Sequence, residues 1–380
     1  MTRGRFVSAI AALSTVCAVF FGACQISSAS TSFSPGVVRG LNSIVTAGMA
    51  ASGTPGLVIG IWDPGVGTYV RANGTSDIST GAPITVGDRF RIASITKTFT
   101  ATVILQLVDQ HRLALGDHLS SYVPGIQNGN RITIAQLLGM TAGVYDYTAD
   151  PKFITDYFGN PLMPFTAQDA LAIIRRHKAP FPPGKQVMYS DSNYVLLELI
   201  AQKITGEPLG QLIQEKILDP LNMTHTSYPT TSAMPSPFTH GYLVQPLGLR
   251  DVTLGNPGVA GGAGAMISNL GDLRVWAKAL ATGTLLSPQL QRLRLRTRPL
   301  LSAAGGKIKS RYGLGLININ GFIGHNGGIL GYGTTMFYLP SKRATIIIED
   351  NTDNVTSNVV NGIFFGVASY LFPQQFPRGI

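Results

Sequence analysis

The sequence predicts an α+β fold: one antiparallel sheet built from both ends of the chain, flanked by helices, with a helical lobe inserted between its two parts. Strand-like runs occur near both ends, at 57–62, 68–73, 314–319, 321–325, 333–338 and 344–349. Helical periodicity dominates between them, so we expect the lobe at roughly 101–255. Because one sheet covered by helices buries all these runs in a single core, we expect residues 31–380 to form one domain.

The individual elements follow in chain order. A linker at 31–45 leads into a first helix. The first hairpin turns at Asp63-Pro64-Gly65, and the last turn is formed by Pro340-Ser341-Lys342-Arg343. Apolar periodicity predicts helices near 94–115, 131–140, 166–178, 192–205, 210–218, 271–282 and 354–371. Gly206 should end the helix at 192–205. The last helix is too short and too polar to span a membrane.

The first thirty residues predict a targeting segment. Arg3 and Arg5 form a basic region, and 6–21 is an apolar stretch slightly too short for a membrane span. Phe21-Gly22-Ala23-Cys24 resembles a bacterial lipobox, in which Cys24 becomes the lipidated first residue. The alternative is cleavage after Ser27-Ser28-Ala29. Both routes export the protein, so we expect a cell-envelope protein anchored to the outer face of the membrane, or a secreted one.

Composition narrows the class of protein further. Hydrophobic residues make up 44% of the chain and charged residues 13%, which favours a large packed core. The two cysteines, Cys17 and Cys24, both lie in the targeting segment, so we expect no disulfide scaffold. The formal net charge of +10 would attract an exported protein to anionic envelope surfaces. The six histidines lack zinc-ligand spacing, and nothing resembles a nucleic-acid module, so we expect neither a metal nor a nucleic-acid partner.

Ser94 and Lys97 form the first candidate site. The alternation around Phe90 and Ile92 predicts a strand, and helical periodicity begins at Ser94. Residues three apart at the start of a helix share a face, so the ammonium can reach the hydroxyl. A serine hydroxyl becomes a nucleophile when a base takes its proton, and a buried lysine that loses its charge can act as that base. A capping serine beside a solvated lysine gives the same pattern, so the pair alone leaves both interpretations open.

A second candidate cluster contains Tyr189 and Asp191. It begins with a Pro-Gly loop at Pro183 and leads into the helix that starts near Ser192. A phenol at the mouth of a helix can hydrogen-bond or exchange a proton. The structural alternative is that Asp191 or Ser192 caps the helix and Tyr189 only packs.

A third candidate cluster, at 324–331, contains His325, Gly327 and Gly328. Glycines let a backbone approach a ligand closely, and their N–H groups could complete an oxyanion hole. The structural alternative is a strand-to-loop turn in which His325 is a surface or core polar residue. A further glycine-rich stretch, 258–264, lacks the phosphate-binding pattern and is expected to border the site.

In this order, the three clusters resemble the motifs of the serine β-lactamase and penicillin-binding protein superfamily. Ser94-Ile95-Thr96-Lys97 matches Ser-x-x-Lys, Tyr189-Ser190-Asp191 matches Tyr-x-Asn, and His325-Asn326-Gly327 matches the Lys-Thr-Gly position in its His-x-Gly variant. The branch that the chain most resembles contains class C β-lactamases, D-alanyl-D-alanine carboxypeptidases, D-aminopeptidases and related esterases. With flanking matches at 134–143, 218–223 and 260–273, the resemblance spans roughly 37–372.

This resemblance implies a role for each residue. Ser94 would attack the carbonyl carbon, and Lys97 and Tyr189 would form the general-base system, with Lys97 making Tyr189 easier to deprotonate. Which of the two takes the serine proton stays open. The backbone N–H groups of Ser94 and Gly328 would form the oxyanion hole. His325 would orient Tyr189 and the substrate.

Two residues depart from the family pattern. Asp191 replaces the usual Asn, and its carboxylate would hold Lys97 charged or change which acyl group fits. Asn193 is two residues further on and should point elsewhere. His325 replaces a permanent cation, which weakens a site for a substrate carboxylate. These departures favour an esterase or a permissive peptidase over a β-lactamase or a strict carboxypeptidase.

Three functions follow as hypotheses. The first is an exported serine hydrolase that forms an acyl-enzyme with D-amino-acid peptides of the cell wall, β-lactams or small esters and needs no cofactor. The second is a non-catalytic, penicillin-binding-like envelope lipoprotein. The third is a structural lipoprotein that docks on membranes through the basic run at 291–298. The alternative interpretation of this run is a solvated strand edge or helix face. The arginines of the run are Arg292, Arg294, Arg296 and Arg298.

Overall fold

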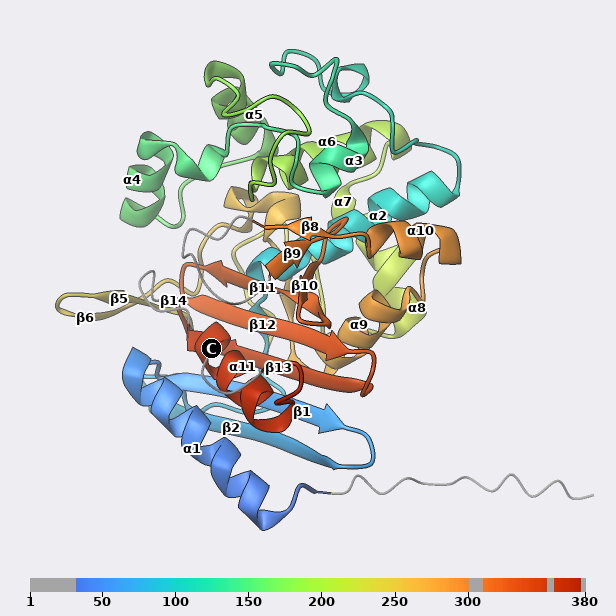
Figure 1. Ribbon diagram of the computed structural model, residues 1–380. Helices are drawn as coiled ribbons and strands as arrows, with labels where there is room; N and C mark the ends of the chain where they lie inside the picture. Colours follow the sequence, from blue (N-terminus) through green and yellow to red (C-terminus); the bar gives the residue numbers. More distant parts are fainter. Residues whose placement is uncertain (1–31, 301–309, 354–358, 377–380) are drawn as a thin grey trace, which may run out of the picture. The chain divides into compact units, whose positions relative to one another are not determined.

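A large antiparallel sheet lies at the centre of the computed structural model, which describes residues 32–300, 310–353 and 359–376 (Figure 1). Within these residues nine strands join in the order β3-β2-β1-β13-β12-β11-β10-β9-β8. Their bounds are Gly56–Asp63 (β1), Gly67–Asp77 (β2), Ala82–Pro83 (β3), Arg298–Pro299 (β8), Ser310–Tyr312 (β9), Ile317–Ile319 (β10), Phe322–Ile329 (β11), Tyr332–Leu339 (β12) and Ala344–Asp350 (β13).

The two ends of the chain meet where β1 pairs with β13. Leu57 lies opposite Asp350 and Trp62 lies opposite Thr345, and every residue of both strands is buried. Strands covered on both faces have continuous apolar runs, which explains why 57–62 and 344–349 are recognisable in the sequence. The prediction of one sheet from both chain ends is therefore confirmed.

Helices α1 (Pro35–Ser52) and α11 (Val359–Leu371) pack together on one face of the sheet (Figure 1). Two glycines of α1 allow this close approach, because a Cβ at Gly40 would lie 2.5 Å from the Tyr370 ring and a Cβ at Gly48 2.4 Å from Ile363. Phe364 of α11 packs on Phe337 of β12 with ring centroids 4.8 Å apart. The predicted last helix is thus present from Val359, and 354–358 lie outside the described residues.

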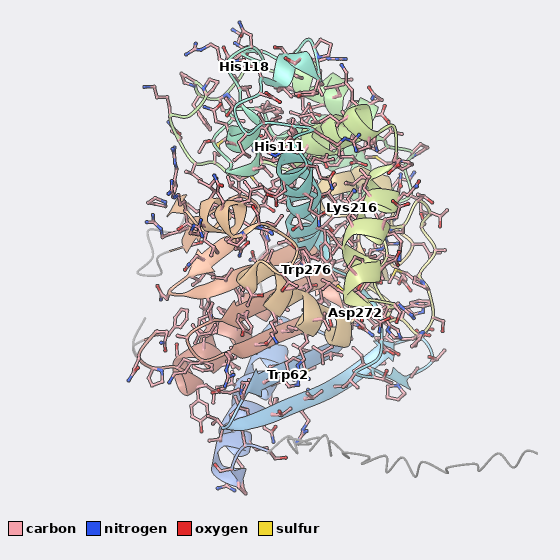
Figure 2. All side chains as sticks on the ribbon, turned by 90° about the vertical axis from the view of Figure 1, so that its right-hand side faces the viewer. Trp62, His111, His118, Lys216, Asp272 and Trp276 are labelled. Atoms are coloured by element: carbon pink, nitrogen blue, oxygen red, sulfur yellow. The ribbon has the colours of Figure 1, made fainter. Side chains whose placement is uncertain are left out.

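Helices α2 (Thr96–Asp109) and α9 (Leu270–Thr282) lie on the opposite side of the sheet (Figure 2). Trp276 of α9 stacks on Phe99 of α2 at 4.2 Å and donates a hydrogen bond of 2.7 Å to Thr98 Oγ1. Helix α2 ends earlier than the predicted Leu115, because His111 has a positive φ of 55° that interrupts the helical path.

The inserted lobe contains most of the remaining helices. Capping boxes at Thr133 and Thr166 start α3 and α5, and Gly206, with φ of 79°, ends α6 as predicted. Helix α4 was not predicted, although Asp150 at its N-cap followed by Pro151 is a start signal. The bounds are Ile134–Leu138 (α3), Pro151–Gly159 (α4), Ala167–Arg176 (α5), Ser192–Thr205 (α6), Leu209–Ile213 (α7) and Asp219–Leu221 (α8).

Two small sheets complete the fold around the start of α2. Strand β4 (Phe90–Arg91) pairs with β7 (Ile267–Ser268), and the hairpin β5 (Tyr242–Gln245) and β6 (Gly248–Asp251) joins β14 (Thr352–Asp353). The alternation around Phe90 and Ile92 predicted the strand at β4, whereas β7, the β5–β6 hairpin and β14 were not predicted.

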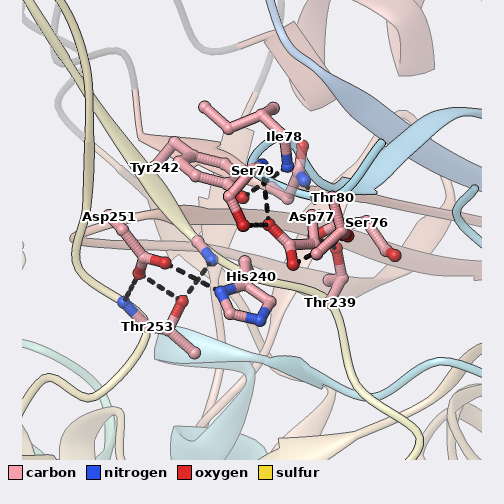
Figure 3. Close-up of polar contacts among 12 residues, drawn as sticks. Ser76, Asp77, Ile78, Ser79, Thr80, Thr239, His240, Tyr242, Asp251 and Thr253 are labelled. Carbon is pink, nitrogen blue, oxygen red and sulfur yellow. Dashed lines mark hydrogen bonds and ion pairs between the residues drawn. The ribbon is translucent and has the colours of Figure 1, made fainter. Parts of the chain in front are cut away.

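Hydrogen bonds hold the base of the β5–β6 hairpin (Figure 3). His240 Nδ1 donates to Asp251 Oδ2 at 2.7 Å, and the backbone N–H of Thr253 donates to Asp251 Oδ1 at 2.8 Å. The carbonyl of Thr253 then accepts a hydrogen bond of 3.1 Å from the buried guanidinium of Arg91. The hairpin therefore helps to position β4, the strand that leads to Ser94.

The basic run at 291–298 does not present all of its arginines to solvent. Its first half lies in α10 (Pro288–Arg294), where Arg292 is exposed and Arg294 is buried. Arg294 donates hydrogen bonds to Thr102 Oγ1 at 2.9 Å and to the Thr98 carbonyl at 3.0 Å, both in α2. Including Arg294 in a membrane-docking surface was therefore wrong. Across the described ranges, no helix combines the length and apolarity that a membrane span requires.

Candidate active site

A strained turn presents Ser94 at the start of α2. Ala93 has a positive φ of 46°, which is uncommon for a residue with a Cβ, and the 3₁₀ turn Ala93–Ile95 runs directly into the helix. Gly327 of β11 lies against this turn, because an added Cβ would be 2.7 Å from the Ser94 nitrogen and 2.8 Å from the Ile92 oxygen. The third cluster and the first are therefore in backbone contact, and only glycine allows it.

Lys97 is fully buried and reaches Ser94, as its position in the sequence predicted. Its Nζ donates a hydrogen bond of 2.8 Å to Ser94 Oγ, a second of 2.8 Å to the Ala263 carbonyl, and a third to the Asp191 carboxylate, with which it forms an ion pair. An ammonium has three N–H donors and no acceptor. All three donors of an ammonium would find an acceptor here, and the side chain is fully buried, so the alternative of a solvated lysine is excluded.

Tyr189 is half-buried, and its side chain lies beside that of Ser94. The Lys97 ammonium lies 4.8 Å from the centre of its ring. Burial, and then the nearby Asp191 carboxylate, raise the pKa of Tyr189 well above its usual value. We expected Lys97 to make Tyr189 easier to deprotonate; in this arrangement the effect of Asp191 and burial prevails, and Tyr189 is a phenol.

Asp191 contacts Lys97 instead of capping α6. It occupies the N-cap position but its side chain makes no capping hydrogen bond, and the Ser192 hydroxyl accepts from the Tyr147 N–H at 2.9 Å. The expected effect of Asp191, a carboxylate that holds Lys97 charged, matches this ion pair. Asn193 points elsewhere, as expected, since its amide lies 3.3 Å from Met140 Sδ.

A second carboxylate, Asp146, lies next to Asp191 and was not predicted. It accepts hydrogen bonds from the backbone N–H groups of Thr148, at 3.2 Å, and of Asp191. Burial, and then the Asp191 carboxylate, raise the pKa of Asp146 to about 7. No sequence spacing indicates this contact, because the two residues belong to different segments of the lobe.

His325 is buried behind Tyr189. Its Nδ1 donates to the Asn326 carbonyl at 2.5 Å, and its Nε2 lies 3.2 Å from the Tyr312 hydroxyl. Burial, and then the Lys97 charge, lower the pKa of His325 to about 3, so the ring is neutral. The His325 and Tyr189 rings are 6.1 Å apart, and no hydrogen bond joins these two described side chains. His325 therefore supplies no positive charge for a substrate carboxylate.

A pocket of about 210 Å³ opens beside Ser94. Gly328 lines it together with Ser94, which places both proposed oxyanion-hole residues at one cavity. The loop 259–264 borders it, as predicted, whereas the aromatic wall of Phe153, Tyr157 and Phe158 comes from the unpredicted α4. Of the described residues that line the pocket, Asp191 alone has a charged side chain.

Two other expectations concern metals and the lipid anchor. In the part of the chain that the structure describes, no three His, Cys, Asp or Glu residues gather as potential metal ligands. Cys24, the expected lipidation site, lies outside the described residues.

Comparison with known proteins identifies the family. The model of the beta-lactamase family matches residues 41–361. A D-stereospecific amidohydrolase from Streptomyces sp. has a similar structure, with a TM-score of 0.78, 30% identity, and coverage of 88% of this chain and 98% of the other.

Curated relatives are also similar over parts of their length. A putative D-alanyl-D-alanine carboxypeptidase of Escherichia coli is 31% identical over 38% of this chain and 35% of the relative's length. The putative penicillin-binding protein PbpX of Bacillus subtilis is 29% identical over 70% of this chain and 62% of the relative's length. The chain thus spans between about a third and two thirds of these curated relatives. The family model covers most of the sequence, so the chain belongs to the beta-lactamase family.

Proposed function

We propose that this protein is a serine hydrolase that forms an acyl-enzyme on Ser94 with amides, peptides or esters, D-amino-acid derivatives among them. The observation that carries the proposal is the hydrogen bond from Lys97 to Ser94, with the Tyr189 ring beside Lys97, at the edge of a pocket. Membership of the family and the likeness to a D-stereospecific amidohydrolase support it.

The contacts of Lys97 suggest how the serine proton moves. Loss of one proton from Lys97 to solvent would free the amine to take the proton of Ser94, and Asp191 stays a carboxylate. Ser94 Oγ then bonds to the carbonyl carbon, and the proton passes to the departing nitrogen or oxygen as that bond breaks. Water hydrolyses the resulting ester and returns the proton to Ser94. The Ser94 and Gly328 N–H groups would stabilise the oxyanion.

The test is turnover and labelling of Ser94. We would incubate the purified protein with p-nitrophenyl butyrate and with D-phenylalanine p-nitroanilide, and search for an acyl adduct on the peptide containing Ser94 by mass spectrometry. Turnover that Ser94→Ala abolishes and Ser121→Ala, at an exposed control serine, preserves is the expected result. No turnover and no adduct from folded protein would refute the proposal and favour a non-catalytic binding protein.

We further propose that the chain is exported and anchored in the envelope through Cys24. The basic residues, the apolar stretch and the lipobox-like sequence before Cys24 support this. Expression of the full chain in a bacterium, with metabolic labelling by a palmitate analogue, tests it. Label in the membrane fraction that is lost in Cys24→Ala is expected; unlabelled protein released by cleavage after Ala29 would contradict anchoring but not export.

A further inference from the structure

The charge of the pocket indicates which acyl groups it accepts. Asp191 is the single charged residue among its described lining residues, and its side chain is 24% exposed. One carboxylate oxygen, Oδ1, pairs with Lys97, and no described residue donates a hydrogen bond to the other oxygen. A partly exposed carboxylate oxygen in an apolar pocket attracts a cationic hydrogen-bond donor and repels an anion.

The surroundings of Asp191 leave negative charge in excess. The titratable groups around it are Lys97 of α2, Asp146 and Tyr147 of the preceding lobe segment, Tyr189, and Tyr312 of β9. Lys97 balances one carboxylate, and the three phenols and the neutral His325 contribute no positive charge. When Asp146 is ionised, two carboxylates therefore face one ammonium, and an additional cation would balance them.

The position of the carboxylate relative to Ser94 fits an α-amino group. Lys97 Nζ contacts both Asp191 Oδ1 and Ser94 Oγ, and both residues line the same pocket, so the carboxylate lies near the serine. In an amino-acid amide, the α-nitrogen is two bonds from the carbonyl carbon that the serine attacks. The aromatic residues of α4, among them Phe153 and Phe158, line the same pocket and suit an apolar side chain.

We propose that Asp191 binds the free α-ammonium of the acyl donor, so that the preferred substrates are amides or short peptides whose scissile carbonyl belongs to an N-terminal amino acid with an apolar or aromatic side chain. N-acylated donors and donors with a carboxylate near the carbonyl, such as penicillins, are poor substrates. This inference rests on the proposed function. It makes Asp191 a substrate-binding residue in addition to its contact with Lys97.

The test compares matched p-nitroanilides on the purified full chain: D-phenylalanine, N-acetyl-D-phenylalanine and 3-phenylpropionic acid. A charge-assisted hydrogen bond predicts that kcat/KM at pH 7 is about 10-fold or more higher for the free amine. The preference should fall as the pH rises through the pKa of the substrate amine, because the neutral amine loses its attraction to Asp191. Equal kcat/KM for the three substrates, with turnover that depends on Ser94, overturns this inference alone.

The Asp191→Asn variant separates binding from proton transfer. Binding of the ammonium predicts that the ratio of free-amine to 3-phenylpropionyl kcat/KM falls toward one, whereas a role only through Lys97 would lower both rates equally and overturn the inference. Asp156→Asn, which removes an exposed carboxylate from α4, should preserve the ratio. If Asp191→Asn does not fold, inhibition of the native protein decides: D-phenylalaninol should inhibit at least about 10-fold more strongly than 3-phenylpropanol. Turnover unaffected by Ser94→Ala would instead refute the proposed function.

Discussion

At the residue scale, the geometry of the candidate site depends on a close backbone contact between β11 and the turn that precedes α2. Gly327 of β11 lies so close to Ser94 that a methyl group would overlap the Ser94 nitrogen, the Ile92 oxygen and the Ala93 Cβ. Two of these three atoms are backbone atoms, which cannot move aside as the end of a flexible side chain can. The strained φ of Ala93 lies in the same turn.

Gly327→Ala should therefore displace the serine. We expect kcat/KM for p-nitrophenyl butyrate to fall by about 100-fold, since a shift of about 1 Å at a nucleophile costs that much, and the free energy of unfolding to fall by roughly 1–3 kcal/mol. Ester hydrolysis and denaturant unfolding measure both. Gly116→Ala is the control, because no atom lies within 4 Å of the added Cβ. Full activity of Gly327→Ala would show that the turn adjusts freely.

At the scale of elements, α10 is attached to the helix that carries Ser94 and Lys97 by a buried cation. The Arg294 guanidinium donates to Thr98 and Thr102 of α2, and no ion pair with a carboxylate is formed within the described parts of the chain. Burial lowers the pKa of Arg294 to about 10, which still leaves it charged at neutral pH.

Arg294→Ala should destabilise the protein by roughly 3–5 kcal/mol, because it removes two buried hydrogen bonds and leaves a cavity. Arg292→Ala, on the exposed side of the same helix, should change stability by no more than about 0.5 kcal/mol. Denaturant unfolding of both variants measures the difference. Equal stability would mean that the contact of α10 with α2 contributes little.

The sheet contains an ionisable group with no partner. Glu349 of β13 is fully buried, and neither carboxylate oxygen has a hydrogen-bond partner among the described residues. Burial raises the pKa of Glu349 well above its usual value. The folded state therefore keeps the Glu349 proton to a higher pH than the unfolded state does. The free energy of unfolding that this proton contributes is complete at low pH. It is lost as the pH rises above the unfolded pKa of about 4.5.

Glu349→Gln keeps the shape of the side chain without the charge. We expect it to raise Tm by about 2 °C or more at pH 8 and to have little effect at pH 4, where the native glutamic acid is already neutral. Thermal unfolding across this pH range is the measurement, with Glu215→Gln as an exposed control. The same pH dependence in native and variant protein would contradict a titrating Glu349.

At the scale of the whole molecule, the features that can be predicted from the sequence are those that short local residue patterns determine. The buried strands at both ends and the three-residue spacing of Ser94 and Lys97 are local, and both predictions are confirmed. The contact of Asp146 with Asp191 depends on how distant segments pack, and nothing in either segment indicates it. Arg294 shows the same limit, because an arginine alternation looks alike whether its side chains meet solvent or α2.

The walls of the pocket come from both the sheet and the inserted lobe, so a ligand should stabilise both. Gly328 and Leu330 belong to the sheet side, and Phe153 and Phe158 to α4 of the lobe. Phenylboronic acid, which can bond to a serine hydroxyl while its ring enters the aromatic pocket, is a suitable probe. We expect slower amide hydrogen exchange in both 326–330 and 151–159, together with a concentration-dependent rise in Tm.

Ser94→Ala should abolish these changes, and α10, which does not line the pocket, should exchange at the same rate with and without the probe. Slower exchange in 326–330 alone would mean that α4 does not contact the ligand, and the aromatic wall could then not select the acyl side chain. Slower exchange in both segments would mean that the acyl group is enclosed between them, as selection of an apolar side chain next to Ser94 requires.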